Sequence, residues 1–299
     1  MRKLIQPVAI LLLPALLLSC KGEKKVEETK EAEVVVEEAK EKSLVKVWET
    51  DTLLTTSESV LFDEANEVLY VSNIGAVPPS AQDGDGFISK VALSGEILEL
   101  KWVEGIDAPK GMGLLNGKLY VADIDELVEI DIASGTIANK YLIEGSAFLN
   151  DITVSDDSTV YISDSDTNKI FSFKNGESSV WMEGDIFGRP NGLLFQGEKM
   201  MQANFASGVL NTIDMATKEL TMLNDSLPGG DGIKAVGDDY LISSWHGQVY
   251  YVTGDGTRST LLDTSADTLN CADIEFIAET SILYVPTFFG NTVAAYELK

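Results

Sequence analysis

Short runs in which apolar and polar residues alternate fill the chain from residue 44 to 299, and no sustained helical periodicity interrupts them. Side chains of a β-strand point alternately to its two faces, so this period of two predicts strands. Turn dipeptides separate the runs, and one of them, Asn175-Gly176, is a preferred sequence for a two-residue hairpin. We therefore expect an all-β fold over residues 44–299.

One unit of this pattern, a polar turn followed by an apolar strand with a small or polar end, recurs along the chain. Its copies are "NEVLYVSN" (66–73), "NGKLYVAD" (116–123), "DSTVYISD" (157–164), "GEKMMQAN" (197–204), "GDDYLISS" (237–244) and "ETSILYVP" (279–286). Another strand precedes each copy, and the leading residues of these strands are Glu58, Lys110, Asn150, Asn191, Asp231 and Ala272. They are 52, 40, 41, 40 and 41 residues apart, and an insertion at 74–86 explains the one long interval.

A repeat of about forty residues with four strands is typical of a β-propeller blade. Six copies predict a six-bladed β-propeller with four-stranded blades. The last copy is followed by only one more strand, "NTVAAYELK", so the sixth blade lacks its outermost strand. We expect the strand within residues 44–54, which precedes the first copy, to supply it and close the ring, leaving no long exposed sheet edge.

The innermost strands of a propeller line its central channel, so their leading residues are expected to form a ring at one mouth. Four members of this ring carry side-chain oxygens, namely Glu58, Asn150, Asn191 and Asp231. Such oxygen donors suit Ca²⁺, with water completing the coordination shell, whereas Zn²⁺ would prefer His or thiolate ligands, which the ring lacks. We expect one divalent metal as cofactor, Ca²⁺ first, with Zn²⁺, Mn²⁺ and Mg²⁺ as alternatives.

A simpler explanation of the same dipeptides remains open. Asn-Asp, Asn-Gly and Asp-Gly are common turn sequences, and each could merely shape the loop that enters its strand. The channel mouth would then be polar without holding a metal. Recurrence of the oxygen-bearing residues at equivalent positions of the repeat favours metal binding.

These motifs resemble those of the gluconolactonase and regucalcin (senescence-marker) lactonases, over about residues 50–299. The matching segments are "ESVLFDEANEVLYVSN", "NDITV", "RPNGLLF" and "GGDGIKAVGDDYLISSW". The resemblance implies a six-bladed propeller with one divalent metal bound by Glu58, Asn150, Asn191 and Asp231, and Asp151 beside the site as a secondary polar group. Members that act on sugar lactones often carry an Arg two residues before the Asn of the third blade. This chain has Phe148 there, which favours a less polar lactone or ester.

The expected activity is hydrolysis of a lactone or related ester, with the metal polarising the carbonyl group. Asp231 is the expected general base, and Asp151 is the second candidate catalytic residue. Lys110 is expected to contact substrate, although it could instead neutralise the acidic ligands beside it. The competing hypothesis is a non-catalytic, membrane-tethered propeller that binds a ligand or a partner protein, because one fold hosts many functions.

The ends of the second strands and the turns after them are expected on the same face as the ring, because strand direction alternates within a blade. This predicts a rim made of Asn73, Asp123, Asp164, Asn204, His246 and the pair Phe288-Phe289. We expect His246, Phe148 and Phe288 to contact substrate, with Phe205, Trp245 and Phe289 extending an apolar wall. The alternatives are a surface turn for His246 and a cover over the core between blades for the aromatic residues.

Residues 1–19 are interpreted as a signal peptide. A short apolar run follows two basic residues, contains Pro7 and Pro14, and ends in Leu-Leu-Ser-Cys at Cys20. This ending resembles a bacterial lipobox, which implies that Cys20 is lipidated and that the protein is a non-cytoplasmic lipoprotein. Lys21 in the next position implies the outer membrane, facing the periplasm or the cell surface. The alternative is an ordinary signal peptide with a chance Cys.

Residues 20–43 combine the acylated Cys with Glu/Lys-rich sequence that we interpret as a solvated tether. The formal net charge of the 299-residue chain is −26, and such an acidic surface repels phosphate backbones, which excludes nucleic acid as an expected partner. Cys271 is the only cysteine besides Cys20, so we expect no disulfide framework and a buried thiol. The sequence indicates no oligomeric state.

Overall fold

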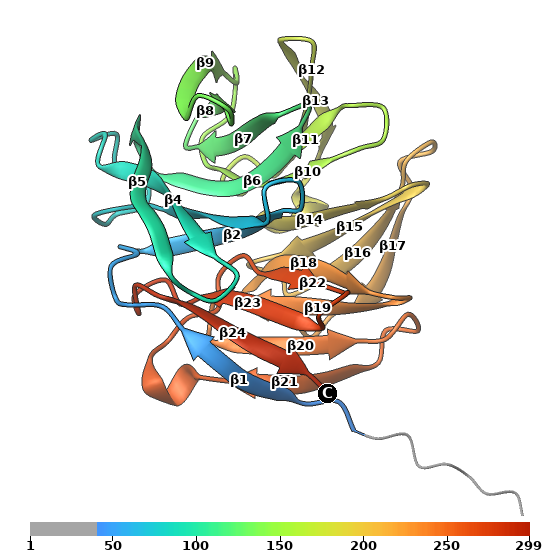
Figure 1. The fold of residues 1–299 in the computed structure, drawn as a ribbon. Helices are drawn as coiled ribbons and strands as arrows, with labels where there is room; N and C mark the ends of the chain where they lie inside the picture. Colours follow the sequence, from blue (N-terminus) through green and yellow to red (C-terminus); the bar gives the residue numbers. More distant parts are fainter. Residues whose placement is uncertain (1–40) are drawn as a thin grey trace, which may run out of the picture. The chain divides into compact units, whose positions relative to one another are not determined.

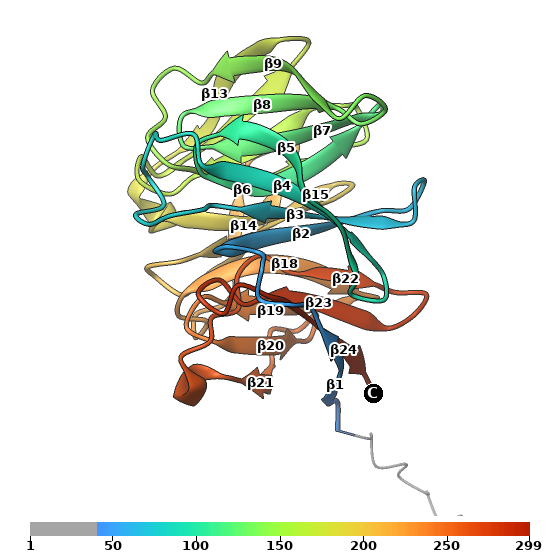
Figure 2. The same ribbon diagram turned by 60° about the vertical axis from the view of Figure 1, so that its left-hand side comes forward.

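The computed structural model describes residues 41–299, which form six antiparallel sheets of four strands each (Figure 1). The inner strands of neighbouring sheets contact one another in sequence, and the last contacts the first, so the sheets form a closed ring. This arrangement confirms the predicted six-bladed β-propeller, and Figure 2 shows the same strands from a second side. We number the blades 1 to 6 in the chain order of their inner strands.

The strands divide by their place in the blade. The inner strands are β2 (Ser57–Asp63), β6 (Pro109–Leu115), β10 (Leu149–Val154), β14 (Pro190–Gln196), β18 (Gly230–Val236) and β22 (Glu275–Ile277). The second strands are β3 (Val68–Asn73), β7 (Lys118–Asp123), β11 (Val160–Asp164), β15 (Lys199–Asn204), β19 (Asp239–Ser244) and β23 (Ile282–Pro286). The third strands are β4 (Gly86–Ala92), β8 (Glu126–Asp131), β12 (Lys169–Lys174), β16 (Leu210–Asp214), β20 (Gln248–Val252) and β24 (Val293–Leu298). The outer strands are β5 (Ile97–Ile106), β9 (Thr136–Leu142), β13 (Glu177–Glu183), β17 (Leu220–Asn224), β21 (Arg258–Asp263) and β1 (Leu44–Glu49).

The sixth blade is completed by the first strand of the fold, as predicted. β1 pairs antiparallel with β24, with Leu44 opposite Leu298 and Glu49 opposite Ala294 (Figure 1). The order of that sheet is β1-β24-β23-β22, so the first and last strands of the described chain pair with each other in one blade. Residues 41–299 therefore contain every strand of the closed ring.

The predicted signal peptide, Cys20 and all but the last residues of the predicted tether lie outside the described residues. Within residues 41–299, no helix has the length and apolar character needed to cross a membrane.

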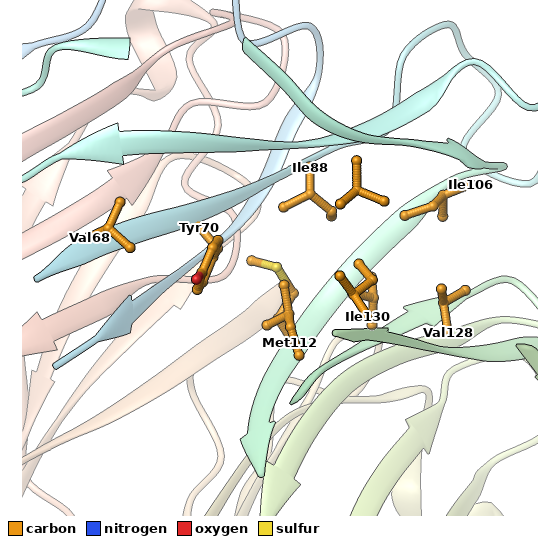
Figure 3. Packing of buried hydrophobic residues seen from close by; sticks show 10 residues of the cluster. Val68, Tyr70, Ile88, Ile106, Met112, Val128 and Ile130 are labelled. Carbon is orange, nitrogen blue, oxygen red and sulfur yellow. The ribbon is translucent and has the colours of Figure 1, made fainter. Parts of the chain in front are cut away.

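The hydrophobic core is divided among the spaces between blades. Figure 3 shows one such space, in which Val68, Tyr70, Ile88 and Ile106 of blade 1 face Met112, Val128 and Ile130 of blade 2. All seven side chains are buried, because each blade turns one set of alternating residues toward its neighbour. Burial of apolar surface between every pair of blades stabilises the ring and holds the inner strands at fixed positions.

A bulge distorts five of the inner strands at the ring positions. The pairing register shifts between Leu149 and Ile152 in β10, between Pro190 and Leu193 in β14, and at equivalent places in β2, β6 and β18. In blade 3, a serine side chain of the second strand replaces a backbone acceptor at the bulge. Ser163 Oγ accepts a hydrogen bond from the Asp151 amide at 2.9 Å. Such bulges re-aim side chains, here toward the channel mouth.

The ring dipeptides lie inside strands, which overturns the explanation that they are turns. Their glycines allow neighbouring inner strands to approach closely. A Cβ on Gly192 would lie 1.9 Å from the carbonyl oxygen of Asp231, and one on Gly111 would lie 2.6 Å from the Cα of Asp151. By contrast, Asn175-Gly176 is the predicted hairpin turn between β12 and β13, with φ values of 53° and 84°.

Candidate functional site

Five of the six ring residues line one cavity of about 330 Å³ at the channel mouth, namely Glu58, Lys110, Asn150, Asn191 and Asp231. They come from the inner strands of blades 1 to 5, and all five are buried. The sixth, Ala272, is fully buried in an apolar cluster with Phe288 and Ile74. The structure thus brings together the four oxygen-bearing residues that the sequence singled out.

Hydrogen bonds orient the two amide groups of the ring. Asn150 Nδ2 donates to Ser165 Oγ at 3.0 Å, and Asn191 Nδ2 donates to Asp231 Oδ1 at 3.0 Å. Both amide nitrogens are therefore engaged, which leaves the amide oxygens available. Asn191 Oδ1 and Glu58 Oε2 are buried and have no hydrogen-bond partner among residues 41–299. Buried oxygens without a donor are costly unless a cation or water satisfies them.

Burial and mutual repulsion dominate the electrostatics of the ring. The pKa of Glu58 is raised well above its usual range by burial, and then by the charges of Asp231 and Asp273. Burial and the Asp273 charge also raise the pKa of Asp231. Burial lowers the pKa of Lys110 to about 8, although nearby acidic groups oppose this shift. The cluster therefore favours a cation between its carboxylates.

The donor set fits a hard divalent cation. Two carboxylates and two amides supply only oxygen, and Ca²⁺ binds six to eight such ligands with water among them. Within residues 41–299, no group of three or more His, Cys, Asp and Glu side chains is arranged to hold a metal, so a site built like those of zinc enzymes is not found there. Glu58, Asn150, Asn191 and Asp231 are the residues that could hold Ca²⁺ at this mouth.

Asp151 is buried behind Asn150 and does not line the cavity. Its Oδ1 accepts a hydrogen bond from the amide of Ile152, and its Oδ2 accepts one from the amide of Leu193, each at 2.6 Å. The first hydrogen bond lies within β10 and the second joins β10 to β14, so both oxygens are used. The structure places this candidate catalytic residue where it ties blades 3 and 4 together, out of reach of a substrate in the cavity.

Lys110 and Phe148 both line the cavity, as expected. The ammonium of Lys110 lies 4.4 Å from the centre of the Phe148 ring, within the range of a cation–π contact, and donates to the carbonyl of Ala108 at 2.9 Å. Asp164 positions Phe148 by accepting its backbone N–H at 3.3 Å and that of Ala147 at 2.7 Å.

The second-strand ends do not form the predicted rim. Asn73, Asp123, Asp164 and Asn204 are at most 1% exposed. The two Asp residues face inward because each accepts hydrogen bonds from the loop that enters the inner strand of its own blade. Asp123, for example, accepts from the amides of Asp107 and Ala108 at 3.0 and 2.7 Å. Asp123 and Asp164 thus hold the loops that lead to the ring residues Lys110 and Asn150.

Four aromatic residues form a connected wall of the cavity: Phe205, Trp245, Phe288 and Phe289. The ring centres of Phe205 and Trp245 are 6.3 Å apart, those of Trp245 and Phe288 are 5.6 Å apart, and those of Phe288 and Phe289 are 4.8 Å apart. Phe288 is thus at the cavity, as expected. His246 is exposed, packs against Phe205 and Trp245, and does not line the cavity.

Sequence reasoning missed five lining residues, namely Ile74, Val77, Pro79, Ser165 and Arg189. The first three start the insertion at 74–86, the one break in the repeat, and its position after a second strand already placed it on the face of the ring. Ser165 follows β11 directly and joins two blades, since its Oγ also donates to the carbonyl of Pro190 at 2.7 Å. Arg189 was missed because its position, two residues before the ring residue, carries Ala108, Phe148 and Gly229 in neighbouring blades, so no residue type recurs there.

No family model and no curated protein matches the chain. Among solved structures, it is similar to a gluconolactonase from Xanthomonas campestris, with 16% identity, a TM-score of 0.63, and coverage of 82% of this chain and 86% of that one. A second protein, assigned as a gluconolactonase, gives 15% identity, a TM-score of 0.64, and coverage of 87% and 93%. A catalytically inactive virginiamycin B lyase from Staphylococcus aureus, solved with Quinupristin, gives 13% identity, a TM-score of 0.61, and coverage of 87% and 100%. At these identities the likeness establishes the propeller fold.

Proposed function

We propose that this propeller is a metal-dependent hydrolase that opens a lactone or related ester, with a divalent cation, Ca²⁺, held by Glu58, Asn150, Asn191 and Asp231. One observation carries the proposal: oxygen donors from four blades meet in one cavity, and two of the buried oxygens, Glu58 Oε2 and Asn191 Oδ1, have no hydrogen-bond partner there. The gluconolactonases among the similar folds support the same reaction class. Four protein ligands are fewer than Ca²⁺ prefers, which leaves positions for substrate and water.

A divalent cation at this site would supply an electrophile that polarises the substrate carbonyl. Asp231 is the general base. Asp231 Oδ1 accepts a hydrogen bond from Asn191 and keeps a lone pair for the cation, so Asp231 Oδ2 is available to take a proton from the attacking water. The water oxygen bonds to the carbonyl carbon, the ring C–O bond breaks, and the proton returns from Asp231 to the departing alkoxide. Lys110, in the same cavity, stabilises the negative charge that develops on the substrate.

The test is proton release from sugar, aliphatic and aromatic lactones by residues 41–299, with Ca²⁺ and then with a chelator. We expect release that the chelator abolishes and that added Ca²⁺ restores. Product mass must also be measured, because the fold is shared with both gluconolactonases and a lyase. Hydrolysis adds one water to the substrate, whereas ring opening by elimination leaves the mass unchanged.

The competing function is ligand binding without turnover. Folded protein that binds Ca²⁺ but releases no proton from any lactone would contradict the hydrolase and support a binding propeller. Mass-neutral ring opening would contradict hydrolysis and support a lyase.

We also propose that the chain is an outer-membrane lipoprotein anchored through Cys20. The support is the sequence alone, in which a short apolar run ends at Leu-Leu-Ser-Cys and Lys21 follows.

A further inference from the structure

Apart from the ring residues Glu58, Lys110, Asn150, Asn191 and Asp231, the lining of the cavity is uneven. Blades 2 to 4 contribute a mixed side, made of Phe148, Ser165, Arg189 and Phe205. Blades 5, 6 and 1 contribute an apolar side, made of Ile74, Val77, Pro79, Trp245, Phe288 and Phe289. This asymmetry continues inside the ring, where Ala272 of the chain segment entering blade 6 replaces a polar residue and packs under Phe288.

The apolar side continues out of the cavity to the surface. Val77 is 54% exposed and Phe289 is 53% exposed, and both line the cavity. Trp245 lies between them and the deeper residues, since its ring contacts both Phe288 and Phe289. A ligand whose reacting group reaches the ring oxygens can thus extend an apolar part along this side and over its edge.

Both cations of the cavity already have partners within the protein, so a permanently charged substituent would have to compete for them. The Arg189 guanidinium forms an ion pair with Asp166 at 2.8 Å. The Lys110 ammonium donates to the Ala108 carbonyl, lies over Phe148, and is attracted by Glu58. Hydroxyl groups would likewise find few partners on the apolar side, where burying them costs free energy.

We propose that the substrate is a small lactone or ester that carries one uncharged alkyl or aryl substituent, with the substituent lying along Trp245, Phe288, Phe289 and Val77. The substrate class rests on the proposed function, whereas the ligand preference of the cavity does not. A cavity of about 330 Å³ is at the small end of ligand sites, so it suits one ring with a short tail and not a large macrocycle. The insertion at 74–86 supplies the aliphatic part of the tail site.

Binding can be tested without turnover by using lactams, which present a similar ring and carbonyl but resist hydrolysis. Ca²⁺-loaded residues 41–299 are titrated calorimetrically with lactams that carry no substituent, alkyl chains of increasing length, a phenyl group, or several hydroxyl groups. We expect affinity to rise roughly fourfold for each added methylene until the tail leaves the wall. The hydroxylated lactam should bind no better than the unsubstituted one.

Two variants and one control locate the tail. Val77→Asp and Trp245→Ala should each reduce the affinity for the longest alkyl lactam at least about tenfold and leave the unsubstituted lactam within about twofold. Leu98→Asp is the matched control, because Leu98 is 56% exposed on the outer strand β5, far from the cavity, and it should change neither affinity.

Affinity that does not change with chain length, or that Val77→Asp and Trp245→Ala leave unchanged, would overturn the inference. The same ligand series as hydrolysable lactones separates the two proposals. Tail-dependent binding of lactams without turnover of any lactone would contradict the proposed hydrolase but leave the ligand preference standing. Turnover without tail dependence would contradict the proposed ligand preference and leave the proposed hydrolase standing.

Discussion

Asn191 donates a hydrogen bond from its amide nitrogen to Asp231 Oδ1 across 3.0 Å, and this contact joins the inner strands of blades 4 and 5. It leaves the buried amide oxygen of Asn191 without a hydrogen-bond partner and occupies one oxygen of the proposed general base. The proposed site needs both consequences. The amide oxygen of Asn191 serves as a ligand of the cation, and Asp231 Oδ2 accepts the proton of the attacking water.

Asp231→Asn should therefore abolish turnover without abolishing metal binding. The amide keeps an oxygen for the cation but cannot accept a proton, and removal of a general base typically costs 10²- to 10⁴-fold in rate. Ca²⁺ affinity measured by calorimetry, together with kcat on the best lactone, checks this. Asp225→Asn, at an exposed position, is the control and should leave both values unchanged. Full turnover by calcium-loaded Asp231→Asn would disprove the assigned role.

Gly192→Ala should destabilise the propeller severely. Its new Cβ would lie 1.9 Å from the Asp231 carbonyl oxygen, so the two inner strands must move apart. We expect a loss of at least about 3 kcal/mol in the free energy of unfolding, measured in urea. Gly197→Ala is the control, because that glycine has φ +62° but nothing within 4 Å of a new Cβ, and it should cost only about 1–2 kcal/mol of backbone strain. Equal losses for the two variants would contradict the close-approach argument.

The stability of the metal-free propeller should depend on pH through Asp273. Burial raises the pKa of this carboxyl from 3.8 to about 6, although Lys234 and a hydrogen bond from Ser59 oppose the shift. The folded state thus binds the proton more tightly than the unfolded state. The stability contributed by protonated Asp273 is fully present below about pH 4 and is lost as the pH rises through about 6.

Asp273→Asn should flatten this dependence, because the amide stays neutral. The difference amounts to about 3 kcal/mol between the two ends of the range. The check is the free energy of unfolding of both proteins from pH 4 to pH 7 in the presence of a chelator. Parallel curves for the two proteins would show that Asp273 does not titrate in this way.

Cys20→Ser should release the protein from the membrane. The thiol is the proposed point of lipid attachment, and hydroxyl replacement leaves no site for the anchor. Fractionation of cells expressing the full chain should show the native protein in the outer-membrane fraction and the variant in the soluble fraction. Incorporation of labelled fatty acid into the native protein, and its absence from the variant, distinguishes lipidation from mere association.

Much of the site was accessible from the sequence because it is repeated. Asn150, Asn191 and Asp231 are 41 and 40 residues apart, which places them at equivalent points of successive blades. Their meeting in one cavity needed only the propeller geometry. Arg189 was not accessible in this way, because the equivalent residue of the preceding blade is Phe148 and no residue type recurs at that position. Asp151 was misplaced for a different reason, since its sequence neighbour Asn150 faces the cavity while its own oxygens bind backbone amides of β10 and β14.

By itself, the sequence determined the all-β class, the number of blades, the closing strand and the ring of leading residues. These follow from the alternation of side chains within a strand and from the spacing of copies along the chain, which are local properties. Only the tertiary structure decided which polar atoms are already hydrogen-bonded, which carboxylates support loops, and which side of the cavity is apolar. Those outcomes depend on contacts between blades far apart in the sequence, as between Ser165 and Pro190 or between Trp245 and Phe289.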